Sequence, residues 1–333
     1  MQNSKKNDHY QKYLASIHNS WVTPDEVIQD IAKEATGQSV KSKFRIIAGE
    51  ANEVYDLTLN EGKHVILRIS TSGHPNFLQE KWALEKVRKL GVPVPEILLI
   101  KFLTIDGKEK SLCLMEKVEG EPLERGNINF DKLDLSLRRN LINQAGEILA
   151  KIHSIQTEGF GWIIGDGKSE FKTSDDLIDN LVSKQDEVEK MAREEDIDQV
   201  NIESAYKIIK SFKDLYAKVN PHLIHGDYSH KHFMVKDNKI TCILDWGAVR
   251  TDTPIYDFAN WDYWFGEYIP TEWLKEGYTD KSLFDDNFED FLHMWRLFKG
   301  LEILHWYHQA KYKPAIEKAK AKLIKDLAYF KAK

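Results

Sequence analysis

Residues 223–257 constrain how this chain can fold more than any other stretch. A short apolar approach leads to His-Gly-Asp at 225–227, and two β-rich runs follow at 233–235 and 240–244. The tetrapeptide Lys-Asp-Asn-Lys between these runs predicts a turn, so the two runs should form a hairpin. The second run ends at Asp-Trp-Gly, residues 245–247. Such a hairpin holds two carboxylates at a fixed separation, one before its first strand and one after its second.

Two carboxylates at a fixed separation are what phosphoryl transfer requires, because one orients the nucleophilic hydroxyl and the other holds Mg²⁺ against the nucleotide phosphates. The spacing in 223–257 is close to that of protein kinases, with a catalytic aspartate, a metal ligand five residues later and an Asp-x-Gly element. The stretch resembles the signature of the aminoglycoside phosphotransferase family: His-Gly-Asp, four residues, Asn, then Ile-Asp-Trp/Phe-Gly. Members of that family are small-molecule kinases with a protein-kinase-like fold.

The resemblance implies a role for each residue of the signature. Asp227 would be the catalytic aspartate, Asp245 a Mg²⁺ ligand, and His225 and Asp257 supports for the loop. His232 stands where the family has a metal-binding asparagine. Because an imidazole nitrogen is a poorer Mg²⁺ ligand than an amide oxygen, we expect His232 to contact a second metal ion or a phosphate. The cofactors that the resemblance implies are ATP, or GTP, and Mg²⁺.

The same resemblance implies an α+β, protein-kinase-like two-lobe fold, for which 333 residues are long enough. We expect a nucleotide-binding N-lobe over residues 1–116, built from a small antiparallel sheet with a helical lead-in. A mostly helical, catalytic and substrate-binding C-lobe should follow over 117–333. Strand-like runs predict five strands in the N-lobe. They are 44–47, 53–59, 64–69, 97–103 and 111–115.

Helical periodicity fills most of the remaining chain. A lead-in pair of helices is expected within 8–36, the first containing Tyr13 and Ile17. Thr23 is the expected N-cap of the second helix, with Pro24 at its first position. Further helices are predicted at 77–90 and 135–155, with two more within 174–218 that meet near 195–200. A final docked helix should bury a stripe formed by Ile316, Leu323, Leu327 and Phe330.

Two segments of the N-lobe are expected to contact the phosphates of the nucleotide. Residues 49–53 contain one glycine, which alone indicates an ordinary hairpin turn. Their position matches the family's glycine-rich loop, however, and makes Asn52 a nucleotide contact. Arg68 lies in the strand that carries the family's phosphate-binding lysine, and a guanidinium can bind phosphate through two hydrogen bonds. Counting back from Gly-Val-Pro-Val-Pro at 91–95 places Glu80 at the family's helix-C glutamate, so we expect an Arg68–Glu80 pair; a solvated helix face is the alternative for Glu80.

The adenine edge is expected at the junction of the lobes. Met-Glu-Lys-Val-Glu-Gly at 115–120 resembles the hinge of family members, where backbone groups hold the base. Met115, Glu116 and Val118 are therefore the expected contacts, and a plain strand-to-loop transition is the alternative.

The acceptor is where the sequence is least specific. Between residues 257 and 290 there are ten acidic side chains against two lysines, interleaved with aromatic residues. Aromatic planes beside carboxylates suit a cationic, ring-bearing small molecule, and amphipathic helices with aromatic cores give the same pattern. The candidate substrate contacts are Trp261, Asp262, Trp264 and Glu267. An aminoglycoside-type antibiotic comes first among the acceptors, with choline-, sugar- or macrolide-type molecules left open.

Composition bears on the location and partners of the protein. The N-terminal fourteen residues lack the apolar core of a signal peptide, and no apolar run approaches the length of a spanning helix. We therefore expect a cytoplasmic protein without membrane partners. We also expect a monomer without nucleic-acid partners. The eight lysines of 311–333 are interpreted as the solvent-exposed face of the final helix rather than as a patch that binds nucleic acid or a membrane. Cys113 and Cys242 lie in apolar runs and should be buried without forming a disulfide.

Two other interpretations of the signature compete with an active kinase. A catalytically inactive nucleotide-binding protein is suggested by Arg68 and His232, which replace the commoner lysine and asparagine, but both signature aspartates are intact. A zinc site could be built from histidines alone. Its ligands would be His222, His225, His230 and His232. No cysteine accompanies them, and such a site leaves the Asp-Trp-Gly element unexplained.

Overall fold

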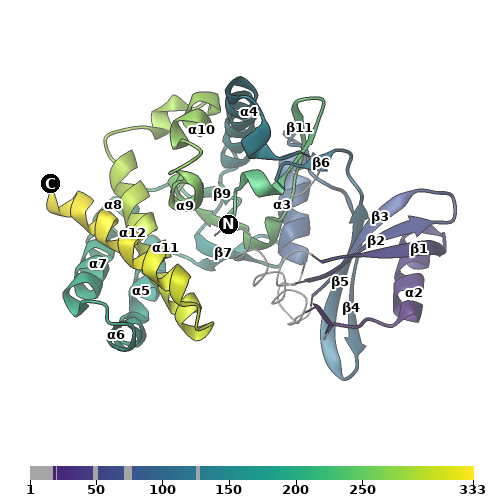
Figure 1. The fold of residues 1–333 in the computed structure, drawn as a ribbon, viewed down its shortest axis with the longest axis horizontal. Coiled ribbons are helices and arrows are strands. Elements are labelled where there is room, and N and C mark those ends of the chain that lie inside the picture. The colour runs from purple at the N-terminus through teal and green to yellow at the C-terminus, as the bar shows by residue number, and fades with distance from the viewer. Residues whose placement is uncertain (1–17, 20, 48–51, 71–76, 125–127) are drawn as a thin grey trace.

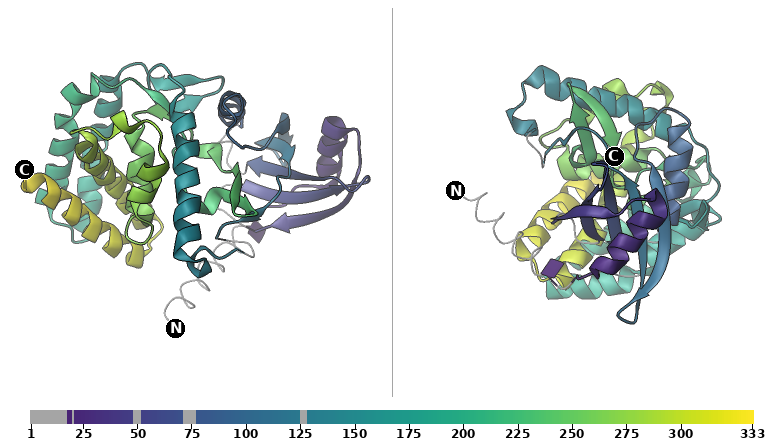
Figure 2. Two further views of the ribbon diagram at one scale, coloured as in Figure 1. Left: turned by 90° about the horizontal axis from the view of Figure 1, so that it is seen from above. Right: turned by 90° about the vertical axis from the view of Figure 1, so that its right-hand side faces the viewer.

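The computed structural model describes the chain except for residues 1–17, 20, 48–51, 71–76 and 125–127, and it has two lobes (Figure 1). A β-sheet forms one lobe and a larger, mostly helical part forms the other, as the view from above in Figure 2 also shows. The predicted α+β two-lobe arrangement is confirmed. The chain leaves the sheet after Glu116 and next pairs, at Glu121, with a strand of the helical lobe. We propose the lobe boundary there, between residues 116 and 117, as the sequence suggested.

The N-lobe is a five-stranded antiparallel sheet in the order β1-β2-β3-β5-β4. Its strands are β1 (Val40–Ile46), β2 (Asn52–Leu59), β3 (His64–Ser70), β4 (Ile97–Ile105) and β5 (Lys108–Glu116). The central strands β2 and β3 alternate in burial, because one face of the sheet packs against α2 (Asp25–Thr36). Leu57 of β2, Leu67 of β3 and Ile28 of α2 meet in that core. All five predicted strands are therefore present.

The start of α2 corrects one prediction. Pro24 occupies the N-cap position and the helix begins at Asp25, without a side-chain cap. Thr23, the expected cap, instead donates its hydroxyl proton to the buried carboxylate of Glu53, at 2.7 Å. A hydrogen bond to a buried carboxylate stabilises the fold more than a cap on an exposed helix end does. This difference explains why Thr23 bonds to Glu53 and does not cap α2. The predicted first helix, with Tyr13 and Ile17, lies outside the described residues.

Helix α3 (Leu78–Arg88) connects the two lobes physically. It follows β3 in sequence, yet Ala83, Leu84 and Val87 pack into the large core of the C-lobe. A turn at Gly91, whose φ is +72°, ends the helical segment where the sequence predicted a stop. This packing places the start of α3 beside the residues of the 223–257 signature.

The C-lobe surrounds the signature with helices. The long α4 (Leu135–His153) confirms the predicted helix, and α9 (Ile255–Phe265) and α10 (Thr271–Gly277) follow the signature. α11 (Phe288–Gln309) and α12 (Lys313–Lys331) pack along each other, and α12 buries Ile316, Leu323 and Leu327. Phe330 is only partly buried against the same core, so the predicted docked final helix is confirmed with one member of its stripe half-buried. Short strands complete the lobe. They are β6 (Glu121–Pro122), β7 (Phe160–Ile164), β8 (Lys168–Phe171), β9 (His222–Ile224), β10 (Phe233–Lys236), β11 (Lys239–Ile243) and β12 (Arg250–Asp252).

The region 174–218 differs from its prediction. Four helices occur in place of two: α5 (Ser174–Ser183), α6 (Gln185–Glu194), α7 (Gln199–Ser211) and α8 (Lys213–Tyr216). The predicted junction between 195 and 200 is present, but further breaks fall at Lys184 and Phe212. Neither residue is a glycine or a proline, so the sequence carries no turn signal at these positions.

Two smaller expectations concern the cysteines and the membrane. Cys113 and Cys242 are both buried and free. Among the described residues, no helix combines the length and the apolar character that a membrane crossing requires.

Candidate active site

The loop at 225–227 is held by a buried carboxylate on the following helix. Asp257, in the first turn of α9, accepts hydrogen bonds from the backbone N–H groups of His225 and Gly226, at 2.9 and 2.8 Å. His153 at the end of α4 lies 3.0 Å from the same carboxylate through Nε2. Buried N–H groups pointed at one carboxylate fix the loop firmly. The predicted supporting role of Asp257 is therefore confirmed.

His225 supports the loop from the other side as a neutral imidazole. Burial lowers the pKa of His225 to about 4, so the ring carries no charge near neutral pH. Its Nε2 lies 3.2 Å from the carbonyl of Leu244, and its Nδ1 accepts from the backbone N–H of Asp227 at 3.3 Å. This pattern needs a proton on Nε2 and a lone pair on Nδ1, and it ties the loop to the end of β11. His225 thus has the predicted supporting role.

Two features of the backbone require a glycine at position 226. Its φ is +83°, and a Cβ added there would lie 2.0 Å from the carbonyl oxygen of Ala248.

We expect Gly226→Ala to lower the free energy of unfolding by roughly 3 kcal/mol or more, because left-handed strain adds to a backbone clash. Gly62 is the matched control, since its φ is +85° but nothing lies near an added Cβ. Gly62→Ala should cost only about 1 kcal/mol, and equal losses in urea unfolding of the two variants would contradict the clash.

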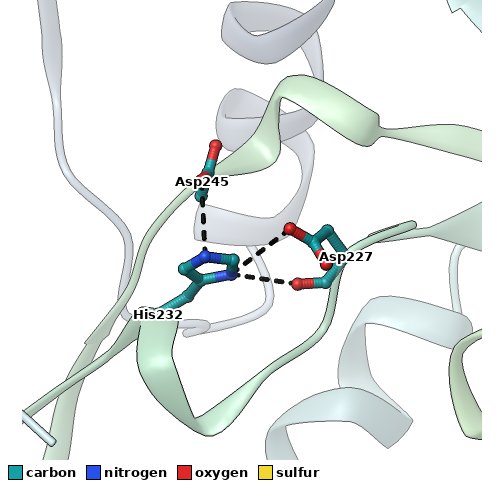
Figure 3. A group of neighbouring side chains, drawn as sticks. All are labelled: Asp227, His232 and Asp245. Carbon is teal, nitrogen blue, oxygen red and sulfur yellow. Dashed lines mark hydrogen bonds and ion pairs between the residues drawn. The ribbon is translucent and has the colours of Figure 1, made fainter. Parts of the chain in front are cut away.

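The side chains of Asp227, His232 and Asp245 lie close together at the end of the 225–227 loop (Figure 3). His232 Nε2 lies 3.4 Å from Asp245 Oδ2, and Nδ1 lies 3.9 Å from Asp227 Oδ2 and 3.0 Å from the Asp227 carbonyl oxygen. The side chains of Asp227 and Asp245 are 47% and 52% exposed, so both remain open to a ligand. Partial burial, together with the Asp245 carboxylate, raises the pKa of Asp227 against the opposing influence of His232.

This cluster has a donor set that fits a divalent cation. Each of the three side chains offers a ligand atom within 4.8 Å of the others. A proton on His232 Nδ1 that is donated to the Asp227 carbonyl would leave the Nε2 lone pair facing Asp245. Two carboxylates are hard oxygen ligands suited to Mg²⁺, and the imidazole is the weaker third member. The cluster therefore fits Mg²⁺ through Asp245, with His232 as an additional contact.

The backbone at Asp245 is bent to present its carboxylate. Asp245 has a φ of +65°, a left-handed conformation that aspartate tolerates better than most residues. Two residues later, Gly247 leaves room for the Glu80 carboxylate, which would lie 3.4 Å from an added Cβ. The Asp-Trp-Gly element thus packs directly against the start of α3.

The predicted ion pair between β3 and α3 is present. Arg68 Nη1 and Nη2 contact Glu80 Oε2 and Oε1 at 2.6 and 3.1 Å, a two-pronged geometry. The Glu80 side chain is 1% exposed, so the alternative of a solvated helix face is excluded for it. Burial lowers the pKa of Arg68, but the carboxylates of Glu80 and Asp245 outweigh it and raise that pKa above its usual range. The guanidinium is accordingly a fixed positive charge beside Asp245.

The remaining nucleotide contacts predicted from sequence lie in the sheet lobe and in the segment that joins the lobes. Asn52 begins β2 and pairs with Ser70 at the end of β3. Met115 and Glu116 end β5, and Val118 lies in the segment that joins the lobes. Residues 48–51, the rest of the expected glycine loop, lie outside the described residues. These positions keep Asn52, Met115, Glu116 and Val118 as predictions.

A hollow of about 320 Å³ opens beside Asp227, and we call it the acceptor hollow. Gly226 and Asp227 line it from the loop, Trp264 from α9, Arg250 from β12 and Lys299 from α11. Of the four predicted substrate contacts, Trp264 alone is among its lining residues. Arg250 and Lys299 were not predicted as site residues from the sequence. A lysine within the apolar run of α11 is a signal that could have indicated Lys299.

Trp261 and Asp262 are corrections to the predicted substrate site. Trp261 is 0% exposed and donates its indole N–H to the Ile269 carbonyl, at 3.3 Å, so it is a core residue. The Asp262 carboxylate pairs with Arg296 of α11 and accepts from the Thr271 hydroxyl, which commits it to holding helices together. Glu267 is exposed but does not line the acceptor hollow.

Five further acidic side chains of 257–290 also have structural partners. Glu276 pairs with Arg139, Glu289 with Lys275 and Asp290 with Lys333. Asp280 and Asp285 accept hydrogen bonds from nearby backbone N–H groups. Seven of the ten acidic side chains of 257–290 are therefore engaged in hydrogen bonds or ion pairs, and none of the ten lines the acceptor hollow.

The histidine-only zinc site is not assembled. His225 is bound to backbone groups, and His230 packs among aromatic rings, including that of Phe265 at 4.9 Å between centroids. Burial lowers the pKa of His230 to about 3. Of the four histidines, His232 alone belongs to the metal-ligand cluster that the described part of the chain contains.

Comparison with known proteins identifies relatives. Residues 43–292 match the phosphotransferase enzyme family. Hygromycin-B 4-O-kinase of Escherichia coli is 19% identical over 226 residues, which are 68% of this chain and 63% of that enzyme, so the chain spans under two thirds of the relative's length.

Solved structures give a wider match. The apo form of a thermostable mutant of aminoglycoside phosphotransferase APH(4)-Ia superimposes with a TM-score of 0.70 at 17% identity, covering 90% of this chain and 98% of that one. Its ternary complex with AMP-PNP and hygromycin B gives 0.69 at 18%, with the same coverage. The gentamicin complex of APH(2")-IIa gives 0.60 at 17%, covering 91% and 97%. At these identities the likeness concerns the fold, and it confirms the predicted protein-kinase-like arrangement.

Proposed function

The chain belongs to the phosphotransferase enzyme family, and from that membership we propose that it is an O-phosphotransferase that moves the γ-phosphoryl group of ATP, or GTP, to a hydroxyl of a small molecule. The observation that carries the proposal is the convergence of Asp227, His232 and Asp245 beside the acceptor hollow. One relative, named as a hygromycin-B 4-O-kinase, and a structural neighbour in a ternary complex with AMP-PNP and hygromycin B support it.

Asp227 is proposed as the residue that receives the acceptor. It lies at the border of the acceptor hollow, where an incoming hydroxyl can donate a hydrogen bond to its carboxylate. The hydroxyl oxygen forms the new bond to the γ-phosphorus, the bond from that phosphorus to the bridging oxygen breaks, and ADP leaves. The hydroxyl proton passes to Asp227 as the new bond forms. The backbone bonds from His225 and Gly226 to Asp257 keep the loop that carries Asp227 in place for this step.

Asp245 and His232 are proposed to hold Mg²⁺, which when bound neutralises charge on the nucleotide phosphates. Arg68, oriented by Glu80, would contact the α- and β-phosphates from the sheet lobe. Asn52 would approach the phosphates from the loop before β2, and the backbone around Met115, Glu116 and Val118 would hold the adenine.

A pair of variants separates the two roles of Arg68. We expect Arg68→Met to raise the KM for ATP about tenfold and to destabilise the fold by roughly 3 kcal/mol, because Glu80 is left as an unpaired buried charge. The double variant Arg68→Met/Glu80→Leu should regain most of the stability, since both charges are gone, without regaining ATP affinity. Urea unfolding and steady-state kinetics on the three proteins check this. Recovery of ATP affinity in the double variant would show that Arg68 acts only through folding.

The proposed activity is tested by substrate-dependent ADP release. Purified protein with Mg²⁺ and either ATP or GTP is screened against antibiotics, sugars and amino alcohols. Release that rises with one acceptor class and disappears in Asp227→Asn supports the proposal. A protein that binds nucleotide but releases ADP no faster than Asp227→Asn with every acceptor would instead be the inactive nucleotide-binding protein. A cytoplasmic location, a monomeric state and the absence of nucleic-acid or membrane partners stay predictions.

A further inference from the structure

The charges that line the acceptor hollow are balanced. Asp227 and Glu302 contribute two carboxylates, and Arg250 and Lys299 contribute two cations. Asp227 is assigned to the reacting hydroxyl, so Glu302 is the one lining carboxylate left for the rest of the acceptor. Glu302 itself pairs with Lys299, so a molecule with several ammonium groups would meet two cations and no unpaired carboxylate other than Asp227.

Lys299 has capacity to bind a ligand. It lies on α11, and its side chain is 24% exposed. The ion pair that the structure gives it is with Glu302, three residues along the same helix, and the Nζ–Oε2 separation of 3.6 Å is longer than a hydrogen bond. An ammonium has three donors, so this contact leaves donors for a ligand.

Arg250 provides a second, independent observation. Its guanidinium stacks 4.1 Å from the ring centre of Tyr256 and donates from Nη2 to Asp252 at 3.0 Å. Its Nε is buried and has no hydrogen-bond partner among the described residues. The residue is only 6% exposed, and leaving a buried donor unsatisfied is costly. Arg250 also lines the acceptor hollow, so its guanidinium places a permanent positive charge beside any ligand there.

Two indole rings complete the acceptor hollow. Trp162 of β7 is 48% exposed, an unusual exposure for the largest side chain, and Trp264 of α9 is partly buried. Both line the acceptor hollow together with Tyr256. Aromatic side chains of this kind commonly line sites for ring-bearing ligands, with a few polar groups that fix the orientation.

We propose that the acceptor is a hydroxylated ring compound with one anionic group, a carboxylate or a phosphate, which Lys299 and Arg250 bind while the ring lies against Trp162 and Trp264. This inference rests on the proposed phosphotransferase function and narrows its substrate class. It replaces the cationic acceptor that the acidic sequence of 257–290 suggested.

The acceptor class is tested with matched pairs that differ in charge. Phenyl β-D-glucuronide is compared with phenyl β-D-glucoside, and uridine 5′-monophosphate with uridine, alongside hygromycin B and gentamicin as cations. We expect an anionic member to reach a kcat/KM at least about tenfold above its uncharged partner and above both antibiotics, which is the effect of one charge-assisted hydrogen bond. If neither anionic member stimulates ADP release above the rate without acceptor, or if a cationic antibiotic is preferred, the inference is wrong.

Lys299→Gln locates the effect in the acceptor hollow. We expect the KM for the anionic acceptor to rise roughly tenfold while the KM for ATP stays within about twofold and kcat changes little. Lys318→Gln, which removes a lysine from the exposed face of α12, is the matched control and should leave all three constants unchanged. A fall in kcat with an unchanged acceptor KM would mean that Lys299 acts on Asp227 or on the transferring phosphate instead, and it would overturn the assignment.

The two proposals can fail separately. Nucleotide binding and slow Mg²⁺-dependent ADP release without acceptor test the phosphotransferase function alone. If both are present and a cationic antibiotic is phosphorylated with a KM that Lys299→Gln does not alter, the function stands and the acceptor class falls. If nucleotide is neither bound nor hydrolysed, both fall.

Discussion

Asp227→Asn is expected to lower kcat by on the order of 10²- to 10⁴-fold while nucleotide affinity stays nearly unchanged. The amide keeps the shape of the side chain but cannot take the hydroxyl proton. The loop itself should persist, because the bonds that hold it run from the backbone of His225 and Gly226 to Asp257. Steady-state kinetics and nucleotide titration on the purified variant measure the two quantities.

A second aspartate in the same hairpin provides the control for this result. Asp237 lies at the exposed turn between β10 and β11, with a φ of +51° that asparagine tolerates. Asp237→Asn should leave kcat unchanged. Near-normal turnover in Asp227→Asn would remove Asp227 from the proposed role, and an equal loss in both variants would point to damage of the hairpin.

Asp245→Asn should reduce turnover by roughly a thousandfold, since several kcal/mol of charge stabilisation through the metal are lost. Asparagine is chosen over alanine because the φ of +65° at this position suits it. The variant should also lose the gain in nucleotide affinity that Mg²⁺ gives to the normal protein. Calorimetric titration of ATP with and without Mg²⁺ measures that gain independently of catalysis.

The titration without Mg²⁺ is the internal control for Asp245. Nucleotide affinity in the absence of metal should be similar in the normal protein and in Asp245→Asn, because the contacts of Arg68 and the hinge do not need the metal. If Mg²⁺ tightens nucleotide binding equally in both proteins, Asp245 does not hold the ion.

The grouping of two aspartates and one ion pair in the candidate site could be predicted from sequence. The signature at 223–257 and the terminator at 91–95 indicated Asp227, Asp245 and the Arg68–Glu80 pair through their resemblance to the aminoglycoside phosphotransferase family. Such patterns succeed because a hairpin and a helix of known length fix where their ends lie. The break of α5 at Lys184 had no such signal, and the cap at Thr23 was lost to a buried carboxylate thirty residues away.

The acceptor side could not be predicted in this way, because it depends on which charges find partners. The sequence shows an acidic, aromatic segment, but it does not show that Arg296 takes up Asp262 or that Trp261 turns into the core. The same composition would describe a cationic-ligand site if those helices were rotated. Burial and ion pairing between helices far apart in the chain decide which of these side chains remain available to a ligand.

The sequence by itself determined the strands of the sheet lobe, the hairpin with its two aspartates and the glycine that the loop needs, since each follows from local spacing and backbone sterics. The tertiary structure alone decided what the acceptor meets. Packing of α11 against α9 brings Lys299 into the acceptor hollow beside Asp227, and pairing of β12 with β9 brings Arg250 there. Contacts between segments so distant in the chain depend on how whole helices pack, and local sequence patterns do not encode that packing.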